Sequence, residues 1–327
     1  MYVIRPVSLR DIDALEHCAA TSGIGLTHLP NNRLALEEKV YDSMLALSKD
    51  ISSPVNENYI FVVSDESSNE VGGTCGIYSR TGVSAPFSVF AVELDHEKGS
   101  QTLRLKNYVN GPSEVGGLYL LPEYRRGGLG LLLSLSRMLF IASHPKRFDD
   151  IVLANMRGII DEGHSVFWNA IGARYYKMSF KDIIMERSVD ELSGILFPQE
   201  PITISSLPSE AREVIGKVHP NTKPALAMLE KEGFRYANEI DPFDGGPILK
   251  AIKAELRTVK QSIVAVVKTI SEKTLEQDKR YMICNGLLDF RVCYSGIEKE
   301  DDGSVTISRD VAKALKVSQG DSIRYVG

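Results

Sequence analysis

The stretch SEVGGLYLLPEYRRGGLGLLLSLSR, residues 113–137, decides the fold of this chain. Residues 115–121 are apolar and uncharged, which favours a buried strand because the run is too short for an independent helix. Pro122 ends that run, and an apolar segment of helix length follows at residues 131–141. The sequence therefore predicts a central strand, a turn and a helix, in that order.

A basic, glycine-rich turn joins this strand to this helix and contains Arg125, Arg126, Gly127, Gly128 and Gly130. Glycines let a phosphate approach backbone amides, and the helix N-terminus and two arginines add positive potential. The spacing matches neither the Walker loop nor G-x-G-x-x-G. Arg125-x-x-Gly128-x-Gly130 instead resembles the acyl-CoA pyrophosphate-binding turn of GNAT acyltransferases. An ordinary strand-to-helix turn with surface arginines is the alternative.

Composition narrows the class of protein. The 327 residues are 43% hydrophobic and 25% charged, so the chain can bury a full core. A net charge of -5 argues against a large positively charged surface, so we expect neither nucleic acid nor a membrane surface as a partner. The start resembles no signal peptide, and no stretch is apolar enough to span a bilayer. The four cysteines are scattered without metal spacing. We therefore expect a cytoplasmic protein with no metal site.

The remaining pattern predicts an α/β (α+β) fold with a mixed central sheet flanked by helices. Further strands are expected at residues 2–5, 59–63, 71–78, 87–92 and 148–156, and helices from residue 8 and at 33–47. Residues 94–112 are polar and are interpreted as an insertion. Two stretches, 167–178 and 226–237, share an apolar helix, a glycine and aromatic residues typical of a strand, so strands are expected at 175–180 and from 234.

The pattern changes near residue 250, and we expect two domains, 1–250 and 251–327. The second has strands at 281–288, 290–294 and 305–307, then a short helix and a last strand within 318–326. This order resembles small β-barrel modules, some of which bind DNA, but the acidic balance argues against DNA. We expect a small β-rich module with a structural or subunit-contact role.

Five longer motifs occur in order: GLTHLP at 25–30, MRGIIDE at 156–162, IGKVHPNTKPA at 215–225, EKEGFRY at 230–236 and FDGGP at 243–247. Together they resemble the bacterial arginine N-succinyltransferase family, nearly end to end. The resemblance implies a GNAT-like fold and transfer of succinyl from succinyl-CoA to the α-amine of L-arginine, in arginine catabolism. Succinyl-CoA would be a cosubstrate, with no tightly bound cofactor.

The resemblance also implies that His219 is the proton donor and that Leu118 contacts the acyl-CoA. An imidazole suits proton transfer because its pKa lies in the working range. From the residues alone, a structural role for a lone histidine would be favoured. The predicted acyl-CoA site is Leu118, Arg125, Arg126, Gly128 and Gly130. Gly116 and Gly117 depart from the family, whose members often have a cysteine and a small polar residue there.

Arginine presents a carboxylate and a guanidinium, so its pocket needs donors at one end and acceptors at the other. Asp244 in FDGGP is the candidate for the guanidinium end, with His28 in the GLTHLP loop opposite. A solvated turn aspartate is the alternative for Asp244. Glu114, at the start of the central strand, remains open between a general base and an ordinary carboxylate.

No cysteine or serine lies in a recognisable nucleophile setting, so direct attack by the bound amine is the simpler mechanism. Two other function classes remain. One is a GNAT-like enzyme that uses another amine, such as ornithine, or another acyl-CoA. The other is a non-catalytic scaffold that binds acyl-CoA. The sequence leaves open whether the chain forms a homo-oligomer or needs a related subunit.

Overall fold

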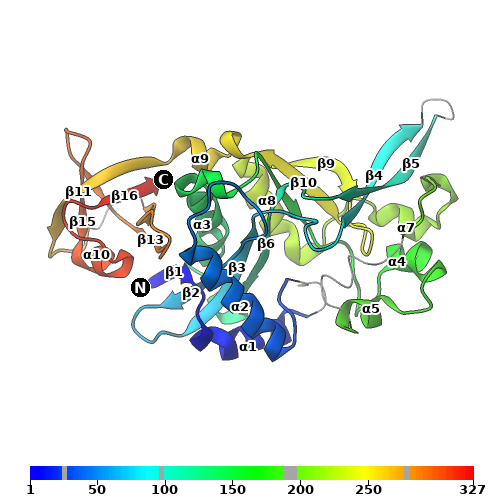
Figure 1. Ribbon diagram of the computed structural model, residues 1–327, viewed down its shortest axis with the longest axis horizontal. Helices are drawn as coiled ribbons and strands as arrows, with labels where there is room; N and C mark the ends of the chain where they lie inside the picture. Colours follow the sequence, from blue (N-terminus) through cyan, green and yellow to red (C-terminus); the bar gives the residue numbers. More distant parts are fainter. Residues whose placement is uncertain (24–27, 96–98, 187–196, 276–279) are drawn as a thin grey trace.

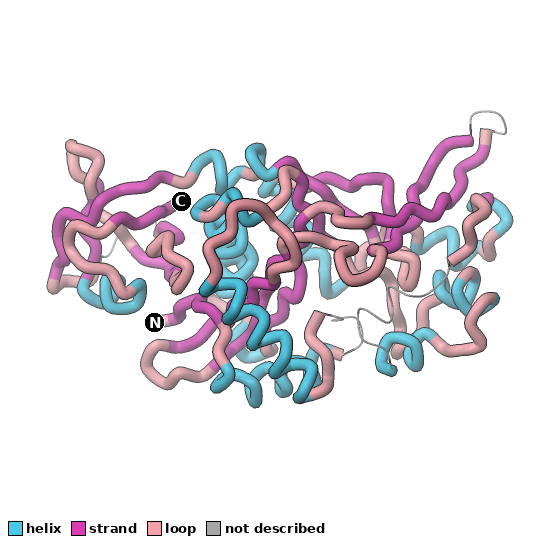
Figure 2. Tube along the Cα trace, in the orientation of Figure 1, coloured by secondary structure: helices cyan, strands magenta, loops and turns pink. Residues whose placement is uncertain are grey.

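The computed structural model describes residues 1–327 except 24–27, 96–98, 187–196 and 276–279. Its strands form one mixed sheet in the order β14-β15-β11-β16-β12-β13-β1-β2-β3-β6-β7-β10-β9-β4-β5-β8. Figure 1 shows an elongated molecule, with the C-terminal strands at one end and the β4–β5 hairpin at the other. Figure 2 shows the strands running between these ends with helices packed along them. The predicted mixed α/β fold is confirmed.

The central strand and its neighbours are sandwiched between two helical layers. These strands are β1 (Tyr2–Pro6), β2 (Asn58–Asp65), β3 (Val71–Tyr78) and β6 (Ser113–Leu120). One face is covered by α1 (Ile12–Ser22) and α2 (Arg33–Ser48), whose buried residues pack against Ile60 and Val62. The alternate residues Phe61 and Val63 pack on the other face against α3 (Leu129–Ser143). Because side chains alternate between the two faces of β2, this strand contributes to two separate cores.

A bulge interrupts the central strand β6. Its register against β3 shifts after Gly116, so that Gly117 and Leu118 together oppose Cys75. Gly117 has a φ of 59°, a left-handed conformation that suits glycine. An extra residue of this kind bends a strand and re-aims its backbone groups, and such bulges are common beside active sites.

The strands β6 and β7 (Ile151–Asn155) run in parallel but pair over a short distance. Their ladder joins Ser113 to Val152 and Glu114 to Leu153, and it extends no further within the described chain. The edge of β6 beyond Glu114 therefore has no strand partner on that side.

The second half of the sheet continues from β7. Its strands are β10 (Pro247–Ile252), β9 (Arg235–Ile240), β4 (Phe87–Asp95), β5 (Ser100–Tyr108) and β8 (Ile202–Thr203). Its helices are α4 (Val166–Ala170), α5 (Phe180–Glu186), α7 (Ser209–Val214) and α8 (Lys223–Glu232). Within the described ranges, no helix is both long and apolar enough to cross a bilayer.

Two predictions for this half were wrong. The polar residues 94–112 contain the strand β5, which pairs with β4 from Phe87–Tyr108 to Asp95–Ser100. The strand expected at 175–180 is a turn leading into α5. Tyr176 serves packing instead, since its ring stacks on Trp168 with centroids 6.1 Å apart.

The C-terminal strands have a core of their own. They are β11 (Ile263–Ser271), β12 (Tyr281–Cys284), β13 (Val292–Ser295), β14 (Glu298–Lys299), β15 (Val305–Ser308) and β16 (Ser322–Val326), with α9 (Arg257–Gln261) before them and α10 (Arg309–Leu315) among them. Val267, Ile307 and Leu315 are fully buried in that core. The sheet nevertheless continues across the expected boundary, because β13 pairs with β1 at Val292 and Ile4. The division at residue 250 stays a prediction.

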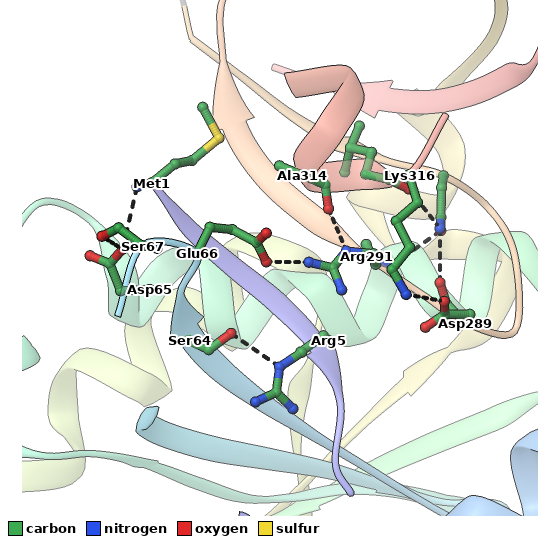
Figure 3. Close-up of polar contacts among 12 residues, drawn as sticks. Met1, Arg5, Ser64, Asp65, Glu66, Ser67, Asp289, Arg291, Ala314 and Lys316 are labelled. Atoms are coloured by element: carbon green, nitrogen blue, oxygen red, sulfur yellow. Dashed lines mark hydrogen bonds and ion pairs between the residues drawn. The ribbon is translucent and has the colours of Figure 1, made fainter. Parts of the chain in front are cut away.

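Polar contacts join this β-rich module to the N-terminal strands (Figure 3). The buried Arg291 donates to the Glu66 carboxylate, in the turn between β2 and β3, and to the Ala314 carbonyl. Beside it, Lys316 pairs with Asp289 at 2.8 Å. One arginine therefore holds parts of both predicted domains together.

Candidate active site

The turn between β6 and α3 leaves backbone amides free. Gly127 and Gly128 have φ values of 61° and 78°, and Gly128 is the N-cap of α3. Within the described chain, the N–H groups of Gly127, Gly128, Gly130 and Leu131 donate to no backbone carbonyl across the turn. A Cβ added at Gly127 would meet nothing within 4 Å, so the turn is open. These amides and the helix dipole form a place where an anion can bind.

Arg125 and Arg126 are exposed beside these amides. The Nε of Arg125 donates to the Leu120 carbonyl at 3.0 Å, and its guanidinium lies over the Tyr119 ring, 5.6 Å from the centroid. This contact fixes the arginine at the end of β6. The structure thus places both predicted arginines at the start of α3, and their binding role stays a prediction.

Arg137 of α3 lies beneath the bulge and is 2% exposed. Its Nη1 donates to the Gly116 carbonyl at 3.3 Å, while Nε and Nη2 donate to the carbonyl and hydroxyl of Ser134, each at 3.0 Å. The ion pairs of the described residues do not include it, and burial lowers its pKa. No role for Arg137 was predicted from the sequence. The structure shows a buried cation that donates to the Gly116 carbonyl, next to the bulge.

His28 lies over the bulge, against Gly116. Its Nε2 is 3.1 Å from Oε1 of Glu114, and its ring stacks on Tyr78 with centroids 4.5 Å apart. A Cβ at position 116 would lie 2.9 Å from His28 ring atoms, so the departure to glycine makes room for this imidazole. Glu114 is only 4% exposed. The loop residues preceding His28, 24–27, lie outside the described residues.

Asp244 fastens two loops together. Its Oδ2 accepts from the Gly158 N–H and its Oδ1 from the Gly246 N–H, each at 2.8 Å. The residue is buried, and burial together with the nearby Asp241 raises its pKa. It is not the solvated turn aspartate considered from the sequence. The geometry argues for a structural role, and contact with a substrate guanidinium stays a prediction.

His219 is attached to the loop that Asp244 holds. Its N–H donates to the Arg157 carbonyl at 2.8 Å, and its Nδ1 accepts from the Asn221 N–H at 3.2 Å. Because Nδ1 accepts, we assign the proton of the neutral ring to Nε2. Burial, and to a lesser degree the charge of Arg157, lowers the pKa of His219, against a hydrogen bond with the Ile160 backbone. The ring is therefore mainly neutral at pH 7.

Asp241 lies near Glu114, the partner of His28. Its Oδ2 accepts from Nδ2 of Asn155, at the end of β7, at 2.8 Å. Burial raises the pKa of Asp241, and the charge of Glu114 adds to that effect. Glu114 and the loop containing Asp244 are thus within electrostatic reach of each other. This proximity joins positions that are far apart in the sequence.

Leu118 is half-buried and packs against the main core beside α3. It is one of the two bulge residues, so it lies on the strand that connects the glycine-rich turn to His28 and Glu114.

No metal cluster of three or more His, Cys, Asp or Glu side chains occurs in the described ranges. All four cysteines are buried free thiols, and burial raises their pKa to about 11 or 12. Such thiols are poor nucleophiles.

Comparisons with known proteins agree over the whole chain. The family model described as "Arginine N-succinyltransferase beta subunit" matches residues 2–258, and that of its C-terminal domain matches residues 263–327. Relatives named arginine N-succinyltransferase include one from Escherichia coli, 35% identical over 339 residues, and one from Salmonella schwarzengrund, 40% identical over 337 residues. Each alignment covers 100% of this chain and 97% of the relative.

A solved structure is also similar. It is that of the arginine/ornithine succinyltransferase subunit AI from Pseudomonas aeruginosa, and it superposes with a TM-score of 0.88 at 32% sequence identity. The match covers 100% of this chain and 98% of that chain.

Proposed function

The chain belongs to the arginine N-succinyltransferase family, and from this premise we propose that it transfers the succinyl group of succinyl-CoA to the α-amine of L-arginine. The products are N2-succinyl-L-arginine and CoA, and the reaction serves arginine catabolism. Succinyl-CoA is a cosubstrate in this proposal, and no tightly bound cofactor is required. Full-length similarity to relatives of that name supports the activity.

The acyl-CoA is proposed to bind along β6. Its pyrophosphate would lie on the amides of Gly128 and Gly130 with Arg125 and Arg126 beside it, and its pantetheine arm would follow the unpaired edge past Leu118. Residues 119–121, between the bulge and Pro122, extend the chain toward the turn by about 10 Å. The observation that carries this assignment is the set of free amides at the start of α3, directly after a strand with one unpaired edge.

The thioester would then lie at the bulge, between His28 and Arg137. The attacking amine must be neutral, and the Glu114 carboxylate with the His28 imidazole is a suitable place for its proton. Arg137 adds positive potential where the carbonyl oxygen becomes negative. The nucleophile is the bound amine itself, which agrees with the raised pKa of every thiol.

His219 is proposed to protonate the departing thiolate. Because its ring is neutral in the resting protein, the extra proton has to come from the tetrahedral adduct, whose nitrogen carries one proton more than the amide product. The ring would take that proton and pass it to the sulfur as the carbon–sulfur bond breaks. This relay needs no proton from solvent, and the one proton released per turnover is the one that the α-ammonium loses earlier to Glu114 and His28.

A thiol-release assay tests the function. We expect CoA release with succinyl-CoA and L-arginine, a matching amount of succinylarginine by mass spectrometry, and a much lower rate with acetyl-CoA. If calorimetry shows succinyl-CoA binding but no amine releases thiol, the chain is an acyl-CoA-binding scaffold.

Ornithine is the second candidate acceptor. The name of the similar protein from Pseudomonas aeruginosa joins arginine and ornithine, and this similarity supports testing both amino acids. Competition between the two amino acids, followed by product ratios, would rank them.

The chain is also proposed to work as a subunit in the cytoplasm. The names "beta subunit" and "subunit AI" of the similar proteins support an assembly with a copy of itself or a related chain. Four unpaired thiols support a reducing compartment. Light scattering of the purified protein, alone and after co-expression with a related chain, tests the assembly.

A further inference from the structure

Arg157 has a hydrogen-bonding need that the described structure leaves unmet. Its Nε is buried and has no hydrogen-bond partner in the described chain, and none of the described ion pairs includes its guanidinium. Other arginines withdrawn from solvent are bonded: Arg5 to Asp11, Arg137 to Ser134 and Gly116, Arg147 to Ala46 and Lys49, and Arg291 to Glu66 and Ala314. Arg157 as a whole is half-buried, but burying its Nε–H without a partner is costly, and an anion bound here would supply that partner.

The backbone around Arg157 is held on three sides. The Met156 N–H donates to Pro247 at 3.1 Å, the Gly158 N–H donates to Asp244 at 2.8 Å, and the Arg157 carbonyl accepts from His219. A Cβ at Gly158 would lie 2.4 Å from the Asp244 carbonyl, so the two loops are in tight contact. The guanidinium is therefore attached to rigid backbone, as a recognition group should be.

Asp244 lies near this guanidinium but forms no ion pair with it. Asp244 contributes to the electrostatic surroundings of Arg157, yet both of its oxygens accept backbone N–H groups. Burial and Asp241 also raise the pKa of Asp244, which favours its neutral form. Arg157 therefore has no ion-pair partner among the described residues, and its charge reaches His219, whose pKa it lowers.

We propose that Arg157 binds a substrate carboxylate beside His219 and so determines which substrates are accepted. The inference rests on the proposed function, because both of its substrates carry a carboxylate: the distal end of the succinyl group and the α-carboxylate of the amino acid. Nε and the neighbouring Nη present two parallel N–H groups, the geometry that matches one carboxylate. MRGIIDE, which contains Arg157, then has a chemical role in addition to its loop contacts.

Calorimetric titration with matched ligand pairs tests the proposal. Succinyl-CoA is compared with butyryl-CoA, which has four acyl carbons and no carboxylate, and L-arginine is compared with L-argininamide. The wild-type protein should prefer the carboxylate ligand in at least one pair by about 10- to 100-fold. Arg157→Gln should abolish that preference, and Arg157→Lys should keep part of it, because a lysine retains the charge without the planar fork.

The affected pair identifies the carboxylate. Loss in the acyl-CoA pair assigns Arg157 to the succinyl end, and loss in the amino-acid pair assigns it to the α-carboxylate. The control is Arg174→Gln, since Arg174 is exposed and outside the proposed site. Its preferences should match those of the wild type.

The proposal is overturned if the wild type shows no preference, if Arg157→Gln keeps both preferences, or if that variant weakens charged and uncharged ligands equally. Thiol release measured on the same samples separates this outcome from the proposed function. A wild type that shows the preference without turnover would refute the function and retain Arg157 as a carboxylate site. Normal turnover with unchanged preferences in Arg157→Gln would do the reverse.

Discussion

The glycine-rich turn at residues 125–130 and the FDGGP loop at 243–247 use glycine for opposite physical reasons. In the turn, an added Cβ would meet nothing within 4 Å at Gly127 and only Leu120, at 3.6 Å, from Gly130. In the FDGGP loop, a Cβ on Gly246 would lie 2.0 Å from the Met156 carbonyl. The turn leaves its amides free for a ligand, whereas the loop uses its contacts to hold neighbouring backbone.

This difference separates two tasks within one site. The open turn can bind a phosphate group because nothing in the described protein competes for its N–H groups. The FDGGP loop fixes the segment that carries Arg157 and, through it, His219. A glycine-rich composition does not tell whether a segment binds a ligand or holds neighbouring backbone in place. The atoms around each glycine decide this.

The largest expected effect is at His219, which is attached to the segment that the FDGGP loop holds in place. His219→Ala should lower kcat by about 10²- to 10⁴-fold, because a positioned acid or base contributes that much. Steady-state kinetics should show little change in either KM, since proton transfer occurs in the transition state. A kcat near that of the wild type would return His219 to its structural role as the cap of the 3-10 helix η6 (Pro220–Thr222).

The pH dependence sharpens this prediction. The lowered pKa means that the neutral ring is present at pH 7 and is lost as the pH falls through a value below the ordinary 6.5. At saturating arginine, kcat should therefore have an acid limb below pH 6.5 that depends on His219. A limb on the alkaline side that disappears in His219→Ala would mean instead that the resting ring is charged.

Gly246→Ala tests the tight packing of the FDGGP loop. The methyl group would collide with the Met156 backbone, and overpacking of this kind costs about 1–3 kcal/mol or more. Thermal unfolding should shift to lower temperature, and kcat should fall because the segment holding His219 moves. An unchanged melting temperature would show that the loop adapts to the added methyl group. The FDGGP loop would then not be more tightly packed than the glycine-rich turn.

Asp244→Asn separates the fastening role from the predicted guanidinium contact. An amide nitrogen cannot accept, so one of the two backbone N–H groups would lose its partner, at a cost of about 1–3 kcal/mol. We expect lower stability with an unchanged preference for arginine over neutral amino acids. Product ratios from amino-acid mixtures measure that preference, and its loss would restore Asp244 as the guanidinium ligand.

Arg125→Ala tests the open turn. Losing a charge-assisted contact to pyrophosphate typically costs about 1.5–3 kcal/mol, so the KM for acyl-CoA should rise roughly tenfold or more. Stability should change little because Arg125 is exposed. The matched variant Arg10→Ala, at another exposed arginine, should leave the KM unchanged. Equal KM values for both variants would make the turn structural.

The sequence predicted the features that are local. The apolar helix expected in the stretch 226–237 is α8, which ends where Gly233 adopts a φ of 111°, and the basic turn was identified because its residues are contiguous. The strand β5 was missed because its outward side chains are polar, as in the cross-strand pair of Arg104 and Glu93 at 2.9 Å. Periodicity describes one segment at a time and does not register pairing with a partner strand.

The missed parts of the site depend on tertiary contacts. His28 and Glu114 are 86 positions apart, and nothing in either segment signals their 3.1 Å contact. Arg157 lies in a motif that the sequence made recognisable, but its unbonded Nε becomes visible only once neighbouring groups are placed. The glycine at position 116 could have indicated such a contact, since a glycine inside a strand often marks a close approach of another group.

The smallest expected effect is at Gly130, and it tests the comparison most directly. Gly130 has no positive φ, and a methyl group there would make an ordinary contact with Leu120 at 3.6 Å. Alanine is a better helix former than glycine by up to about 1 kcal/mol, so Gly130→Ala should unfold at the same temperature or slightly higher. Its affinity for succinyl-CoA should fall modestly if the methyl group crowds a phosphate. Measured beside Gly246→Ala, this variant gives the contrast in one experiment: the same added methyl group leaves the open turn stable and destabilises the fastened loop. Equal loss of stability at both positions would mean that the open turn is as constrained as the loop, and the free amides of α3 would then need another explanation.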